Sequence, residues 1–143
     1  MLTLRLILWT LAAPLALWRG PLAVFAAWRP RRTRPDSQPI AALVARADRV
    51  LLFRMGGKLL FRTRCLKRTL VLFRLLRLYG HPAVAYIGLV TTPDGARSGH
   101  AWLCVQGERI PDPDFAPGGA FTAFYEIGDE TRALQDAPAT PLP

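Results

Sequence analysis

Three residues of this chain could together carry out acyl transfer: Cys65, His100 and Asp112. A cysteine attacks a carbonyl carbon as its thiolate, a histidine removes and later returns the proton, and a carboxylate holds the imidazole in the required tautomer. Taken singly, each residue also has an ordinary structural explanation, as a buried thiol, a hydrogen-bonded core histidine or a turn carboxylate. The elements that would position the three residues therefore decide between these interpretations.

Cys65 stands at the start of a predicted helix. Apolar residues follow it at steps of three and four, which predicts one buried face made of Leu66, Thr69, Leu70, Phe73, Leu76 and Tyr79. The basic residues between them are expected mostly on the other side of the helix, and they are Lys67, Arg68, Arg74 and Arg77. Gly80 and His81-Pro82 then predict the end of the helix. The positive end of the helix dipole and the neighbouring basic side chains favour the thiolate form of Cys65.

Two strands and a turn are predicted after this helix. Residues 83–90, "AVAYIGLV", are rich in β-formers, and "PDGARSG" reads as a turn. In "HAWLCVQ", residues 100–106, alternation places His100, Trp102 and Cys104 on one face and the intervening residues on the other. Asp112 would end a third short strand. A cysteine at a helix start, a histidine on the next antiparallel strand and a carboxylate beyond it is the order used by papain-type and transglutaminase-type triads.

Cys104 has two further interpretations, a second nucleophile and a metal ligand. It lies about 13 Å along the strand from His100, at roughly 3.3 Å per residue. A metal site made from Cys65, His100 and Cys104 would lack the usual closely spaced pair of ligands. We therefore expect Cys104 to be a packed core thiol, and we predict no metal and no cofactor.

Composition limits the class of protein. At 143 residues and 51% apolar residues, the chain suits one folded domain, and its two cysteines provide no disulfide framework, which favours a reducing, intracellular setting. The net charge of +9 indicates either an anionic partner or a solvated arginine-rich face. The basic residues form two clusters, Arg29, Arg31, Arg32 and Arg34, then Arg54, Lys58, Arg62, Arg64, Lys67, Arg68, Arg74 and Arg77. No zinc spacing, stacking motif or helix-turn-helix signature is present, so we expect no specific nucleic-acid partner.

The amino-terminal residues 1–28 are strongly apolar, with Arg5 and Arg19 as their charges. Three interpretations stay open: short helices, divided at Pro14 and at Gly20-Pro21, that pack on the domain or a partner; a membrane-associated segment; and a cleaved signal peptide. Because the next segment is arginine-rich, the rest of the chain stays cytoplasmic if residues 1–28 enter a membrane. We expect a cytoplasmic protein, with membrane association through residues 1–28 as the alternative.

The expected domain organisation follows from these segments. Residues 29–39 are an Arg- and Pro-rich linker, residues 40–128 form the domain, and residues 129–143 form a disordered tail. The domain would open with a helix whose apolar residues begin at Ile40 and which Gly56-Gly57 ends or breaks. The fold class predicted is α+β, with the cysteine-bearing helix packed on a small antiparallel sheet and apolar helices before it.

Several motifs of this order resemble those of the transglutaminase-like leader peptidases of lasso peptide biosynthesis, the microcin-processing type. They are "CLKRTL" at the helix start, the helix end "YGHP", the strand "IGLV", the strand "HAWLCV" and the following "PD". The resemblance spans roughly residues 45–115. Thr69 replaces a common Ser, and Leu103-Cys104 replaces a common Val-Glu.

The resemblance implies a papain/transglutaminase-like core and a cysteine endopeptidase that cuts the leader from a ribosomally made precursor peptide. It implies Cys65 as nucleophile, His100 as base and Asp112 as orienting acid, with Asp114 as the alternative to Asp112. Its implied partners are the precursor peptide, a separate winged-helix leader-recognition protein and an ATP-dependent lasso cyclase. Two rivals stay open: a transglutaminase-like acyl transferase, and a basic partner-binding or membrane-binding module whose Cys and His are structural.

Overall fold

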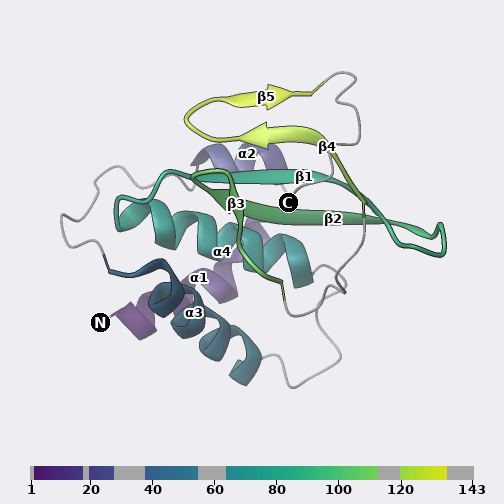
Figure 1. Cartoon of the computed structure of the whole chain (residues 1–143). Coiled ribbons are helices and arrows are strands. Elements are labelled where there is room, and N and C mark those ends of the chain that lie inside the picture. The colour runs from purple at the N-terminus through teal and green to yellow at the C-terminus, as the bar shows by residue number, and fades with distance from the viewer. Residues whose placement is uncertain (1, 18–19, 28–37, 55–63, 113–119, 135–143) are drawn as a thin grey trace.

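The computed structural model describes residues 2–17, 20–27, 38–54, 64–112 and 120–134. Within these ranges the chain forms helices first and strands afterwards (Figure 1). The helices are α1 (Leu2–Leu17), α2 (Pro21–Ala27), α3 (Ile40–Arg54) and α4 (Arg64–Leu78). The strands are β1 (Ala83–Thr91), β2 (Arg97–Val105), β3 (Glu108–Arg109), β4 (Ala120–Ile127) and β5 (Thr131–Ala133). The predicted α+β class and the order of helix, strand and hairpin are confirmed.

The strands form one antiparallel sheet in the order β3-β2-β1-β4-β5. Gln106 and Gly107, both with positive φ, turn β2 into β3, as a two-residue hairpin of this twist requires. The tail expected to lack structure from residue 129 instead contributes β5. Residues 135–143 lie outside the described residues, as do most of the predicted linker and Gly56-Gly57.

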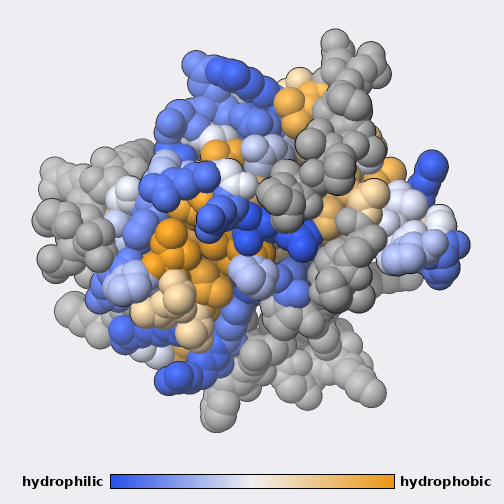
Figure 2. Space-filling view, in the orientation of Figure 1, coloured by the Kyte–Doolittle hydropathy of each residue, from blue (hydrophilic) through white to orange (hydrophobic). Residues whose placement is uncertain are grey.

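Helix α4 lies between the sheet and the helices α1 and α3 (Figure 1). Its residues Leu70, Phe73 and Leu76 are fully buried in a core that reaches into the sheet at Ala85 and Leu103. Seen from outside, hydrophobic residues gather over these helices, and hydrophilic residues surround them (Figure 2).

The predicted solvated face of α4 is wrong in part, because this helix is covered on more than one side. Lys67 is only 2% exposed. The Arg74 guanidinium lies over the Trp9 ring at 4.7 Å, and Arg77 donates a hydrogen bond to the carbonyl of Ala83. These basic side chains are used inside the fold and do not form one free cationic surface.

The far face of the sheet carries a second apolar cluster of Val90, Trp102, Cys104 and Phe121. Phe121 reaches this face because of a bulge in β4: Ile87 pairs with Tyr125, and the next residue, Gly88, pairs with Ala123. Beyond the extra residue, each side chain of β4 points to the opposite face of the sheet from the one that simple alternation would give. Glycine is required at position 88, since a Cβ there would lie 1.9 Å from the carbonyl oxygen of Thr122.

The two amino-terminal helices pack into the main core. Leu6 of α1 and Phe25 of α2 are fully buried, and the Phe25 ring meets Phe73 edge-on at 5.4 Å. The chain breaks between α1 and α2 near Gly20, as predicted, but Pro14 does not divide α1, which continues to Leu17. None of the described helices is long and apolar enough to span a membrane.

Helix α4 ends where the sequence predicts. Gly80 adopts a positive φ of 82°, the His81 N–H bonds to the Leu76 carbonyl at 3.0 Å, and the Gly80 N–H bonds to the Arg77 carbonyl at 3.1 Å. This is the Schellman pattern of a glycine cap. It turns the chain directly into β1 and so fixes how α4 lies on the sheet.

Candidate active site

Cys65 lies in the first turn of α4, a helix that packs against β2. Its sulfur accepts hydrogen bonds from the side chain of His100 and from the backbone N–H groups of Ala101 and Leu66. The helix start thus brings the sulfur to the strand that carries the histidine. Three donors converge on one sulfur atom, which is the arrangement that a thiolate requires.

Thr69, one turn further along α4, fixes the helix to the same point of the strand. Its buried hydroxyl donates a hydrogen bond of 3.0 Å to the carbonyl oxygen of Ala101. Ala101 therefore uses both backbone groups toward α4, its N–H for Cys65 and its carbonyl for Thr69. Helical periodicity alone places Thr69 on the apolar face, although a lone hydroxyl on such a face indicates a specific partner.

His100 lies between Cys65 and Asp112. Its Nε2 is 3.4 Å from Oδ2 of Asp112, and the two side chains are 11% and 10% exposed. Since Nε2 faces the carboxylate, Nδ1 is the ring nitrogen available to the thiol. The rings of Trp102 and Phe121 lie 6.3 and 6.1 Å from the imidazole and shield it from water.

The electrostatics of the site favour a charge-separated pair. Burial raises the pKa of the Cys65 thiol, but the hydrogen bonds from His100 and Ala101 and the charge of His100 outweigh it, so this pKa lies below its usual value. Burial lowers the pKa of His100, yet hydrogen bonds to Asp112 and Cys65 and their charges raise it to about 9. Both shifts favour thiolate beside imidazolium at neutral pH.

A salt bridge that was not among the residues predicted from the sequence supports the segment bearing Asp112. Arg68 of α4 donates two hydrogen bonds, of 2.7 and 2.9 Å, to the carboxylate of Asp48 in α3. It donates a third, of 2.9 Å, to the carbonyl of Pro111. One guanidinium thus joins two helices to the residue before Asp112. The "CLKR" spacing contained a hint of it, because Arg68 follows Cys65 by three residues and lies on the same side of the helix.

The other residues singled out from sequence lie elsewhere. Cys104 packs in the second apolar cluster, as alternation along β2 predicted, and burial raises the pKa of its thiol. Asp114 lies outside the described residues, so the structure places Asp112 beside His100 without testing the alternative. Within the described part of the chain, no group of three or more His, Cys, Asp and Glu residues could hold a metal ion.

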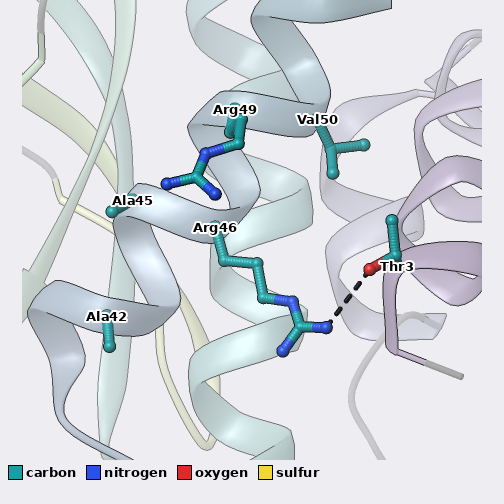
Figure 3. A pocket seen from close by; sticks show the side chains of 6 residues that line it. All are labelled: Thr3, Ala42, Ala45, Arg46, Arg49 and Val50. Carbon is teal, nitrogen blue, oxygen red and sulfur yellow. Dashed lines mark hydrogen bonds between the residues drawn. The ribbon is translucent and has the colours of Figure 1, made fainter.

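A hollow of about 600 Å³ lies apart from this site, between α1 and α3. Figure 3 shows its basic lining, in which Arg46 donates a hydrogen bond of 3.2 Å to the hydroxyl of Thr3 and Arg49 lies nearby. None of Cys65, His100 and Asp112 lines it. The candidate chemistry therefore belongs to the junction of α4 and β2 and not to this hollow.

A protein-family model described as the transglutaminase-like superfamily matches residues 7–125. No curated protein and no solved structure matches the chain. The match covers most of the chain, from within α1 to within β4. It thus contains the helix-borne cysteine, the strand-borne histidine and the aspartate that follows. This chain belongs to the transglutaminase-like superfamily, whose members are typically cysteine-dependent hydrolases or transferases.

Proposed function

We propose that this protein is a cysteine endopeptidase that removes the leader from a ribosomally synthesised precursor during lasso peptide maturation. The observation that carries the peptidase chemistry is the contact of Cys65 with His100, whose Nε2 lies 3.4 Å from Asp112. The leader-peptidase assignment is supported by the motifs "CLKRTL" and "HAWLCV". Cys65 is the nucleophile, His100 the acid and base, and Asp112 the residue that orients His100.

The first half-reaction forms a thioester. The Cys65 thiolate attacks the scissile carbonyl carbon, and the oxyanion that results lies at the positive end of α4. His100 then gives its Nδ1 proton to the amide nitrogen as the carbon-nitrogen bond breaks, so the peptide with the new amino terminus leaves as an amine. Asp112 accepts the Nε2 hydrogen bond and stabilises the imidazolium before transfer.

The second half-reaction decides between hydrolase and transferase. In a hydrolase, neutral His100 removes a proton from water, the hydroxide attacks the thioester, and the thiolate leaves as the leader carboxylate forms. In a transferase an amine takes the place of water, with the same residues in the same roles. The triad serves both reactions, and the leader-peptidase motifs are the reason for preferring water.

The proposed partners follow from the same assignment. They are the precursor peptide, a separate winged-helix protein that binds the leader, and an ATP-dependent cyclase that takes the released core peptide. The described residues before Cys65 are helices that pack on one another and on α4, and none of them forms a winged-helix unit. The exposed Leu4 and Leu8, one turn apart on α1, are a surface where a partner or a membrane could bind.

The test is proteolysis of a precursor peptide by the full chain, with and without a winged-helix leader-recognition protein. Candidate precursors are short peptides encoded beside this gene. Mass spectrometry should find two products whose masses sum to that of the precursor plus one water. Cys65→Ala should give none, whereas Cys104→Ala should cleave normally.

Two results would contradict the proposal. Products that carry an added amine and not water would replace the peptidase with the transferase. Equal cleavage by wild type and Cys65→Ala would show that the thiol is not the nucleophile, and the binding-module alternative would then be preferred.

A further inference from the structure

Strand β2 has part of its outer edge unpaired by any described strand beside Cys65. On its inner side it pairs with β1 along its whole length. On its outer side, β3 pairs only with Cys104 and Val105. Across the ranges that the structure describes, no strand pairs with the outer edge of residues 97–101. This edge leads directly to the residue that contacts the Cys65 sulfur.

Two hydrogen bonds establish which backbone groups point outward. The Thr92 N–H bonds to the Ala96 carbonyl on the β1 side, and the Ile110 N–H bonds to the Leu103 carbonyl on the outer side. Backbone groups alternate along an antiparallel strand, so residues 97, 99, 101 and 103 face outward. Ala101 is already used by Cys65 and Thr69. Gly99 is the next outward residue.

Among the residues that the structure describes, none crowds Gly99. It is exposed, and a Cβ built on it would meet no atom within 4 Å. Its outward N–H and carbonyl stand about 6.8 Å from those of Ala101, which is two residues of an antiparallel strand. Helix α4 begins at Arg64, one residue before Cys65, whose sulfur accepts the hydrogen bond from Ala101. A chain running along this edge would reach the sulfur of Cys65.

We propose that the outer edge of β2 at Gly99 binds the peptide substrate as an added strand, with the scissile carbonyl beside Cys65. This inference rests on the proposed peptidase function and names how its substrate is held. An extended backbone is the ligand that supplies alternating carbonyl and N–H groups to a strand edge. The Cys65 thiol attacks a substrate carbonyl that must lie beside Ala101. The same extended peptide then lies beside Gly99, two residues further along the edge. A helical or folded substrate segment could not pair there.

The test measures how cleavage depends on single backbone N-methyl groups in the precursor. A set of synthetic precursors carries one N-methyl amide each, at successive positions on both sides of the scissile bond. On the side that pairs with β2, kcat/KM should fall about threefold to tenfold at every second position, because each such methyl removes one main-chain hydrogen bond. The positions between them should be cleaved almost normally.

The outcomes separate this inference from the proposed function. Normal cleavage of the unmethylated precursor with no two-residue alternation would overturn strand addition while leaving the peptidase intact. If the unmethylated precursor is not cleaved by wild type, the peptidase proposal fails, and strand addition of a substrate fails with it.

A protein variant gives a second readout. Gly99→Pro removes the outward N–H, and we expect KM to rise about threefold to tenfold while iodoacetamide alkylation of Cys65 stays unchanged. Ala133→Pro is the matched control, because Leu134 bonds its N–H to the Phe124 carbonyl and the N–H of Ala133 therefore points outward at the opposite edge. Unchanged KM in Gly99→Pro would overturn the inference. Should Gly99→Pro fail to fold, the N-methyl series decides alone.

Discussion

Cys65, at the start of α4 beside β2, and Cys104, on the far face of the sheet, lie in different surroundings. Cys65 receives hydrogen bonds from an imidazole and two backbone N–H groups, whereas Cys104 packs among Val90, Trp102 and Phe121. Burial raises the pKa of both thiols, and only at Cys65 do donors and charge reverse the shift. The difference teaches that the lowered pKa of the Cys65 thiol comes from where α4 begins and from what faces it on β2, and not from exposure of the sulfur.

The largest expected effect comes from replacing Cys65 by alanine, with the same replacement at Cys104 as the comparison. Cys65→Ala should lower kcat/KM for precursor cleavage by about 10⁴-fold or more, as loss of a catalytic nucleophile does in comparable triads. Cys104→Ala should change kcat/KM by less than about twofold and reduce stability by about 1 kcal/mol through lost packing. Initial rates and thermal unfolding of the two variants measure this contrast. A comparable loss of rate in both variants would contradict the comparison.

Alkylation should reveal the same contrast without a substrate. A thiol with the ordinary pKa of 9.0 is about 1% thiolate at pH 7, so His100→Ala should slow iodoacetamide alkylation of Cys65 at pH 7 by up to about 100-fold. Peptide mass spectrometry follows both cysteines in one sample, with Cys104 as internal control. If Cys65 is alkylated at the same rate in wild type and His100→Ala, the thiolate-imidazolium pair does not form.

The pH dependence should depend on Asp112. The imidazolium of His100 persists up to its pKa of about 9, so kcat/KM should fall as pH rises through that value, and also as acid protonates the thiolate. Because the folded pKa is raised, the stability from this imidazolium is complete below about 6.5 and is lost as pH rises through about 9. Asp112→Asn should move the alkaline limb to lower pH and reduce kcat/KM about tenfold. An unmoved limb would exclude Asp112 as the orienting acid.

Much of this contrast could be predicted from the sequence, because it depends on local patterns. Periodicity placed Cys65 at a helix start and Gly80 at its end, and alternation placed Cys104 on the face of β2 opposite Leu103. The residue order then indicated how the three candidate residues could meet.

The remaining features depend on contacts between distant segments. Lys67 is buried on α4, a helix that α1, α3 and the sheet all contact, and a single helix pattern does not reveal such contacts. The bulge opposite Gly88 changes the facing of Phe121, and counting residues in β4 does not disclose it. The pair of Arg68 and Asp48 joins residues 20 positions apart that belong to different helices.

The smallest expected effect concerns Arg68, which acts on the site only through the segment before Asp112. Arg68→Lys keeps the charge but loses the planar guanidinium, which donates hydrogen bonds to both Asp48 and the Pro111 carbonyl. We expect kcat/KM to fall about threefold to fivefold, with the alkaline limb of the pH profile moved toward that of Asp112→Asn. Asp48→Asn is the matched control: it weakens the pair between α3 and α4 but leaves the donor to Pro111, so it should reduce stability by about 1 to 3 kcal/mol and leave the limb in place. If the two variants lose stability equally and neither moves the limb, Arg68 only joins the helices, and Asp112 holds its position beside His100 without it.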